Sequence, residues 1–444
     1  MEELYNKYKY SFLKRTLKIM QSPSFGGMLL VFCVFLAMVF ANSPYKKYYF
    51  DFIHMPITIS MGSYVNTHSI LDVVNDGLMV FFFFLVGLEI KREILVGHLR
   101  KVKMALFPVV SAVGGVMAPA IIYFLFNHNS PNVIGWAIPT ATDIAFSLAV
   151  LSLISSIVPI GLKVFLTTLA IADDIIGIII IGILYTSQLS LVPLGFAVLF
   201  LWLMYILNKI GIRSTFAYTL LSVLVWIAVA KSGIHPTIAG VLAAMMIPVK
   251  PKVAFHDYVK RSRNHLKKLI ISEKSRVNIL TDEKAKESIF TIGELSERAL
   301  TPLTKMEVGL HSFVHYLVLP FFAFVNSGLT FSAETEIFST VTIGVFMGLF
   351  VGKPLGIYAM ARITTLLKIA SPPQDVTWNH IFGAGIIAGI GFTIALFMTS
   401  LVFDGQHAAD SAKIGIAVGS FCSALVGLAF LKHVAPNKSK SNNC

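Results

Sequence analysis

Long apolar runs recur along the whole chain, and they constrain its fold more than any other feature. A helix needs about 20 largely apolar residues to cross the hydrocarbon core of a bilayer. Hydrophobic residues make up 56% of the chain and charged residues only 13%, about half the charged share of a soluble domain. This composition excludes a soluble protein and predicts an all-α polytopic membrane protein. We place twelve spans near residues 26–42, 71–90, 104–126, 133–154, 162–185, 190–209, 213–231, 234–249, 311–330, 338–361, 379–403 and 410–431.

The distribution of basic residues predicts the topology. The net charge is +13, from 36 Lys and Arg against 23 Asp and Glu. Only Lys46, Lys47 and Lys413 fall in loops on one side, and Lys231 and Lys353 lie in or at the edge of spans, so 31 of the 36 fall on the other side. Because Lys and Arg are enriched in cytoplasmic loops, both termini are expected in the cytoplasm. The basic charge therefore reflects topology, and nucleic-acid binding is not expected.

The predicted spans divide the chain into five parts. These are a cytoplasmic N-terminal segment 1–25, spans one to eight in 26–249, a cytoplasmic loop 250–306, spans nine to twelve in 307–432, and a cytoplasmic tail 433–444. The loop mixes basic and acidic residues, which predicts short amphipathic helices or a partly disordered linker. Residues 43–70 contain aromatic and β-branched side chains, and a strand or hairpin is possible there.

Glycine recurs at every fourth position of the tenth predicted span, at Gly344, Gly348, Gly352 and Gly356. Residues four apart lie on one helix face. Small residues at this spacing let helix backbones approach each other closely in lipid. We therefore expect tight helix packing in the C-terminal part of the chain, and we assign the glycines no further role.

Known catalytic motifs are missing from the sequence. It contains no P-loop, HExxH or GxSxG motif. The three cysteines, Cys33, Cys422 and Cys444, lie far apart and form no CxxC pair, which excludes a zinc ribbon or a thiol redox site. We therefore expect neither an enzyme nor a bound cofactor.

Four charged residues stand out because they fall in the middle of predicted spans: Asp143, Asp173, Asp174 and Lys353. A charged side chain at the bilayer centre costs about 3 kcal/mol even on the most lenient scale, so such residues are candidates for function. Asp143 follows Pro139, which disturbs a helix. Broken helices at membrane depth occur only where they line a cavity or are buried in protein. Backbone and hydroxyl oxygens beside a carboxylate suit a hard cation such as Na⁺ or Li⁺.

Asp173 and Asp174 are neighbours on a predicted helix, so their side chains point about 100° apart. One of them can face a cation site while the other faces a basic residue. Two carboxylates this close in a low-dielectric site resist ionising together, so at least one is expected to hold a proton that a cation can displace. Lys353 needs a carboxylate or helix-end carbonyls nearby. An Asp173–Lys353 pair is the simplest arrangement.

Seven short segments, in order along the chain, match motifs of one family. They are Phe83–Glu93, Thr140–Phe146, Ala172–Asp174, Lys231–His235, Phe322–Gly328, Gly352–Gly356 and Gly389–Thr393. Together they resemble the NhaA family of bacterial sodium/proton antiporters, over nearly the whole chain. The resemblance implies a fold of 12 transmembrane helices with inverted repeats and two discontinuous helices. The second break is then expected between Gly383 and Gly391.

The resemblance also implies roles for the buried charges. Asp174 corresponds to the carboxylate that binds the cation and exchanges protons, and Asp173 to the pH-sensitive partner of Lys353. Thr142 and Asp143 fall on the first broken helix, where Thr142 is a possible cation ligand. Asp174 and Asp143 are the expected ligands of the transported Na⁺ or Li⁺, with no other metal. Asp143 and Lys353 also suit the balancing of opposed helix-end dipoles, since helix N-termini favour negative charge and C-termini positive charge.

Regulatory residues are implied less specifically. Glu89, Glu93 and Glu307 resemble a cytoplasmic pH-sensing cluster of the family, and solvated helix ends are an equally good interpretation. His235 resembles a residue that tunes the pH response, because histidine titrates near neutrality. An ordinary histidine at a helix start explains it as well. The 250–306 loop is longer than in the best-known members, so the pH profile is not carried over from them.

The function expected from these features is secondary active antiport. Na⁺ or Li⁺ and protons would compete for the aspartates, so that sodium leaves in exchange for protons. The resemblance implies electrogenic, pH-regulated exchange in the bacterial inner membrane, in contact with lipid, by a homodimer with residues 43–70 as the candidate contact. Two alternatives stay open: a cation channel, and an intramembrane aspartyl protease.

Overall fold

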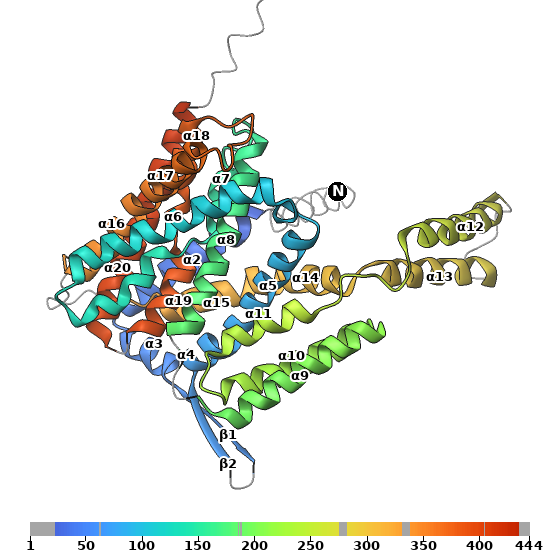
Figure 1. The fold of residues 1–444 in the computed structure, drawn as a ribbon. Helices are drawn as coiled ribbons and strands as arrows, with labels where there is room; N and C mark the ends of the chain where they lie inside the picture. Colours follow the sequence, from blue (N-terminus) through green and yellow to red (C-terminus); the bar gives the residue numbers. More distant parts are fainter. Residues whose placement is uncertain are drawn as a thin grey trace, which may run out of the picture. The chain divides into compact units, whose positions relative to one another are not determined.

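The computed structural model describes residues 23–61, 64–184, 186, 189–274, 282–330, 338–403 and 405–434. Within these ranges the chain is helical apart from one antiparallel β-hairpin (Figure 1). It divides into two compact units. The first takes the described residues within 1–82, 92–187 and 314–444, and the second takes those within 83–91 and 188–313. Residues 1–22 and 435–444 of the predicted terminal segments lie outside the described residues.

The first unit contains most of the elements. Its N-terminal part consists of α2 (Pro23–Ala41), α3 (Lys46–Ile53), β1 (Pro56–Met61), β2 (Tyr64–Ser69), α4 (Ile70–Asp72), the π-helix η1 (Val73–Leu78) and the start of α5 (Met79–Leu95). Its middle part consists of the 3₁₀-helix η2 (His98–Arg100), α6 (Val102–Asn127), the 3₁₀-helix η3 (Pro131–Thr140), α7 (Ile144–Ser152) and α8 (Ile160–Leu184). Its C-terminal part consists of the π-helix η4 (Val314–Val318), α15 (Leu319–Asn326), α16 (Thr340–Met347), the π-helix η5 (Gly348–Gly352), α17 (Lys353–Leu366), α18 (Trp378–Ala388), α19 (Phe392–Val402) and α20 (Gln406–Val434).

The second unit is a smaller bundle joined to a long helical hairpin. It consists of the middle of α5, α9 (Leu191–Ile210), α10 (Thr215–Ala230), α11 (Pro236–Met246), α12 (Phe255–Lys274), α13 (Glu283–Ala299) and α14 (Pro302–Phe313). Its core is apolar, with Leu88, Met204, Tyr218 and Ala244 fully buried. The Lys91 ammonium donates to the carbonyls of Met245 and Ile247, so it neutralises the C-terminal end of α11.

Apolar helices occupy all twelve of the predicted spans. Seven described helices are long and apolar enough to cross a membrane, and up to ten spans result if each of three bent helix pairs counts as one. Two further predicted spans contain the shorter apolar helices α10 and α11. The polytopic all-α fold is therefore confirmed. The count of twelve and the inverted repeats stay predictions, because length and composition alone do not settle them.

The close packing predicted from the glycine repeat is present where α16, η5 and α17 meet α6 and η3. Gly114 of α6 faces Gly356 of α17, and a Cβ atom on either would collide with the carbonyl oxygen of the other. A Cβ at Gly352 would lie 2.9 Å from the Cα of Pro119, and one at Gly348 would lie 2.6 Å from the Cβ of Pro139. These contacts hold the start of α17 against α6 (Figure 1).

The two least certain segments of the sequence are both well formed. The strands Pro56–Met61 and Tyr64–Ser69 pair antiparallel, with Ile57 opposite His68 and Thr58 opposite Thr67, so the predicted hairpin is confirmed. The 250–306 loop contains α12 and α13, of 20 and 17 residues, lying side by side. The prediction of amphipathic helices is thus confirmed, the helices are longer than expected, and the partly disordered alternative is wrong for both of them. The residues between them, 275–281, lie outside the described part.

Candidate functional site

Two interrupted helices meet in the core of the first unit. The chain bends by 42° between η3 and α7 and by 46° between α18 and α19. The breaks touch, since the backbone N–H of Asp143 donates to the carbonyl of Ile390 at 2.7 Å. Gly391 permits this approach, because a Cβ there would lie 2.7 Å from the carbonyl oxygen of Ala141. Both discontinuous helices predicted from the sequence are therefore present, at the expected positions.

One carboxylate caps both helices that leave this crossing. Asp143 is the N-cap of α7, and its Oδ1 accepts from the backbone N–H of Phe146 at 2.9 Å. Its Oδ2 accepts from the backbone N–H of Thr393 at 3.0 Å and from the Thr393 hydroxyl at 2.6 Å. Negative charge at a helix N-terminus is stabilising, and here two N-termini share it. Thr393, which the sequence did not single out, is the second element of this arrangement.

The C-terminal end of α18 is tied to the first broken helix by hydroxyl groups. The carbonyl of Ile387 accepts from Ser147 at 3.2 Å, and the carbonyl of Ala388 lies 3.0 Å from the Thr142 hydroxyl. The same hydroxyl lies 2.6 Å from Oδ2 of Asp173. A hydroxyl has only one proton to donate, so Thr142 can serve Ala388 or Asp173 but not both at once. Thr142 therefore links the helix crossing to the carboxylates of α8.

Lys353 and Asp173 form a buried ion pair, as predicted. The Lys353 ammonium donates to Oδ2 of Asp173 and, at 2.8 Å, to the Thr142 hydroxyl. Both charged side chains are essentially inaccessible, with 0% and 1% of their surface exposed. Burying an ion pair costs desolvation energy that its attraction barely repays, so a pair like this one is weak evidence for a stabilising role. Within a membrane span, it points to function.

Asp174 adds a further negative charge next to this pair. Asp174 is buried, and its carboxylate attracts the Lys353 ammonium electrostatically. Among the described residues, Oδ1 of Asp173 has no hydrogen-bond partner. Counted as ionised, the carboxylates of Asp173 and Asp174 outweigh the Lys353 ammonium by one charge, and Asp143 adds a third buried carboxylate at the helix crossing. A buried region of this kind is stable only when protons or a cation supply the missing positive charge.

The residues predicted to sense pH lie on α5, on α14 and at the start of α11. Glu89 and Glu93 are one turn apart on α5, and Glu93 lies 3.5 Å from Arg92. Glu307 is buried on α14. His235 is the N-cap of α11, and its Nδ1 lies 2.7 Å from the Thr237 hydroxyl. His235 therefore caps the start of α11.

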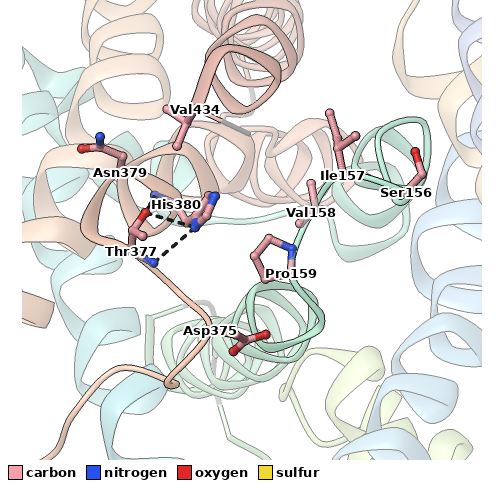
Figure 2. Close-up of a pocket in the computed structure, with 9 residues that line it drawn as sticks. All are labelled: Ser156, Ile157, Val158, Pro159, Asp375, Thr377, Asn379, His380 and Val434. Carbon is pink, nitrogen blue, oxygen red and sulfur yellow. Dashed lines mark hydrogen bonds between the residues drawn. The ribbon is translucent and has the colours of Figure 1, made fainter. Parts of the chain in front are cut away.

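A separate pocket of about 620 Å³ lies at the start of α8 and α18 (Figure 2). The Asp375 carboxylate accepts from the backbone N–H of Gly161 at 2.8 Å, and Thr377 pairs with His380 in the capping box of α18. Between this pocket and the aspartates, both helices contribute to a buried apolar cluster that includes Leu162, Phe165 and Ile381. The polar groups of the pocket therefore anchor the starts of the two helices.

Comparison with known proteins places this geometry in a family context. A family model described as Na⁺/H⁺ antiporter 1 matches residues 17–431. The chain is 40% identical over 429 residues to the Na(+)/H(+) antiporter NhaA of Wolinella succinogenes, covering 96% of this chain and 95% of the relative. It is 42% identical over 425 residues to the Na(+)/H(+) antiporter NhaA of Helicobacter pylori strain J99 (94% and 95%). It is 39% identical over 433 residues to the protein of the same name in Parabacteroides distasonis (94% and 95%).

Proposed function

The chain belongs to the Na⁺/H⁺ antiporter 1 family and is therefore a multi-pass membrane transporter and not an enzyme, and from this premise we propose that its buried aspartates exchange Na⁺ for protons. The observation that carries the proposal is the excess of buried negative charge next to Lys353, where the carboxylates of Asp173 and Asp174 face a single ammonium. Because the site needs added positive charge, it holds either protons or a cation, and this competition couples the two fluxes.

Asp174 is the residue that we assign to cation binding. Its neighbour Asp173 is already engaged by Lys353 and Thr142. The carboxylate oxygens of Asp143 accept three hydrogen bonds from two helix N-termini. These contacts occupy the Asp143 carboxylate, so we place it as a support of the site and second to Asp174 as a ligand. Thr142 is close enough to Asp173 to contribute an oxygen when its own proton turns toward Ala388.

Electrogenic exchange follows from the number of groups that can lose a proton. Asp174 is one such group, and the Asp173–Lys353 pair shares another. If one Na⁺ displaces a proton from each, more protons than sodium ions cross per cycle, and net charge moves. The proposed direction under a proton gradient is proton entry and sodium extrusion. We extend the proposal to Li⁺, because carboxylate and hydroxyl oxygens suit both small monovalent cations.

The crossing of the interrupted helices is the element that we propose moves. Thr142 contacts the end of α18, the Asp173 carboxylate and the Lys353 ammonium. A change of proton or cation at the aspartates therefore alters the contacts between both broken helices directly. Rocking of such a bundle against the remaining helices would give alternating access.

Several finer features belong to the same proposal. We place the protein in the bacterial inner membrane with both termini in the cytoplasm, on the strength of the basic residues on one side. We assign pH regulation to Glu89, Glu93, Glu307 and His235. We expect a homodimer through the β-hairpin, because a two-stranded sheet leaves unpaired edges on which a second copy can add strands.

The test uses everted membrane vesicles with an acid interior and a pH-sensitive dye. Na⁺, Li⁺ or K⁺ is added across a range of pH to vesicles that contain the wild type or the Asp174→Asn variant. We expect Na⁺ and Li⁺ to collapse the pH gradient only in the wild type. Collapse by Asp174→Asn at the wild-type rate would contradict the site assignment.

A second arm of this experiment separates the antiporter from a cation channel. Valinomycin and K⁺ clamp the membrane potential while Na⁺-driven proton movement is followed. A more negative potential on the proton-receiving side accelerates electrogenic exchange and leaves electroneutral exchange unchanged. Sodium flux that persists with no proton movement would favour the channel and contradict the proposal.

A further inference from the structure

Helix α12 has one face that its partner helix covers and an apolar flank that stays open. Tyr258 donates to or accepts from the Ser296 hydroxyl of α13 at 3.1 Å, and Ser262 on the same face is buried. The next residues around the helix, Phe255, Val259, Leu266 and Ile270, are 47% to 76% exposed. At about 100° per residue, these four side chains fall within about 60° of one another. They form a continuous stripe along the helix, which we call the apolar flank.

Basic residues border the apolar flank. On the same helical wheel, Arg263 and Lys267 follow Ile270 directly, and both are exposed. Helix α12 carries six Lys and Arg against two Asp and Glu, whereas α13 carries three against four. The positive charge is therefore a property of α12 and not of the hairpin as a whole. A basic amphipathic helix of this composition is typical of membrane-surface binding.

The root of the hairpin lies where the apolar helices of the second unit end. The backbone N–H groups of Lys252 and Val253 donate to the carbonyl of Arg298, and the backbone N–H of Leu303 donates to the carbonyl of Pro248. Phe255 thus follows the last residue of the apolar helix α11, Met246, by nine positions. Two further basic side chains lie at the same end of the unit. Lys91 donates to a carbonyl at the end of α11, and Arg213 donates to the carbonyl of Lys250. The hairpin therefore begins where these apolar helices end.

We propose that α12 lies with its apolar flank on the anionic lipid headgroups of the membrane that holds the protein. Phe255, Val259, Leu266 and Ile270 would enter the boundary between headgroups and acyl chains. Arg263 and Lys267 would contact lipid phosphates, as basic residues beside a membrane-inserted flank do. The proposal concerns a lipid-binding surface and does not depend on ion exchange at the aspartates.

The test measures the surroundings of α12 in the full-length protein. Cys33, Cys422 and Cys444 are replaced by serine, and an environment-sensitive fluorophore is attached to Leu266→Cys on the flank or to Asn264→Cys, which is exposed on the opposite face. Both proteins are reconstituted in phosphatidylcholine vesicles, with or without phosphatidylglycerol. We expect the Leu266→Cys label to shift to the blue, and to be quenched by headgroup-nitroxide lipids, when phosphatidylglycerol is present. The Asn264→Cys label is expected to stay in water.

Two paired variants test the charges. Arg263→Gln with Lys267→Gln removes one Arg and one Lys beside the flank, and Arg261→Gln with Lys268→Gln removes the same charges from the far side. The first pair is expected to lower the ratio of lipid-bound to free label about thirtyfold, since each basic residue next to an anionic surface strengthens binding roughly fivefold. The second pair is expected to change it less than threefold.

Three outcomes would overturn the proposal. A Leu266→Cys label that stays in water in phosphatidylglycerol vesicles would show that lipid does not bind the flank. Equal protection of the label in both kinds of vesicle would show that the headgroup charge is irrelevant. Protection that persists in lipid-free detergent, or rises with the density of protein in the bilayer, would show that a second copy covers the flank.

Discussion

Two parts of the first unit hold buried carboxylates in contrasting ways. At the helix crossing, backbone N–H groups and one hydroxyl hold Asp143, and all of these donors belong to helix N-termini. On α8, side chains alone hold Asp173: the ammonium of Lys353 and the hydroxyl of Thr142. The first set of donors is built into the fold, and the second set can turn, exchange a proton or move.

The difference teaches which charges can take part in transport. A carboxylate whose donors are mainly backbone N–H groups can change its hydrogen-bond partners only if the helices themselves move. A carboxylate beside another carboxylate and a lysine gains or loses a proton with the charge around it. In the proposed mechanism, the helix crossing is therefore the fixed support, and the α8 carboxylates are the exchangeable part. The following predictions set one part against the other.

The largest effect is expected from Asp174→Asn, which removes an exchangeable charge and keeps the shape of the side chain. Exchange should fall at least a hundredfold, because no proton can be displaced at that position. The folded fraction, measured by size-exclusion chromatography in detergent, should equal that of the wild type. An Asp174→Glu variant is the matched control, and it should retain part of the activity.

The second largest effect concerns the ion pair. Lys353→Met alone should lower the free energy of unfolding by about 3–5 kcal/mol, because Asp173 is left as an unpaired buried charge. Adding Asp173→Asn should restore most of this stability, while exchange stays impaired. The measurement is the thermal midpoint of the purified proteins. Equal destabilisation by the single and the double variant would show that the pair does not act as a unit.

In contrast to Asp174→Asn, the Asp143→Ala substitution at the helix crossing is expected to destabilise the fold. Loss of a charged cap shared by two helices should cost about 3 kcal/mol of stability, since hydrogen bonds to charged groups contribute about 1.5–3 kcal/mol each. Asp143→Asn should recover part of the loss, because its side-chain oxygen still accepts a hydrogen bond. An Asp143→Ala protein as stable as the wild type would remove the distinction between the two parts.

The competition between protons and sodium predicts a pH dependence with a definite sign. As pH falls, more of the exchangeable carboxylates hold protons, so the half-saturating concentration of Na⁺ should rise. The limit is about tenfold per pH unit for each proton that competes with the cation. The slope is read from exchange rates in vesicles at several fixed pH values. A half-saturating concentration that is independent of pH would argue for separate proton and cation sites.

The smallest effects compare two threonines. Thr142→Val and Thr393→Val each remove one hydroxyl, and each should cost about 1 kcal/mol of stability. Only Thr142→Val should also raise the half-saturating concentration of Na⁺, because Thr142 contacts Asp173 and Lys353 whereas Thr393 contacts Asp143. Similar transport changes in both variants would show that the helix crossing and the α8 carboxylates do not have separate roles.

The sequence allowed much of this site to be predicted, because charges in apolar runs are rare and costly. The pairing of Asp173 with Lys353 followed from the need of a buried lysine for a partner. The break near Pro139 followed from a residue that disturbs helices, and the break near Gly389 followed from the family resemblance. The place of Asp143 at a helix N-terminus followed from the family resemblance, and the charge preference of helix N-termini explains it.

Other features could not be predicted, because they depend on segments far apart in the chain. Thr393 shares the Asp143 carboxylate only because two broken helices cross, and no local signal marks it. The three π-helices η1, η4 and η5 insert an extra residue into a turn without a distinctive composition. The length of α12 and α13 was underestimated because their mixed charges resemble those of a linker.

The central claim is that one buried site holds either protons or a cation, and proton release on Na⁺ binding tests it most directly. Na⁺ is added to the purified protein in weakly buffered detergent solution, and the released protons are counted with a pH indicator. We predict release from the wild type and from Thr393→Val, and none from Asp174→Asn. Proton release that is unchanged in Asp174→Asn, or Na⁺ binding to the wild type that releases no proton, would contradict the account.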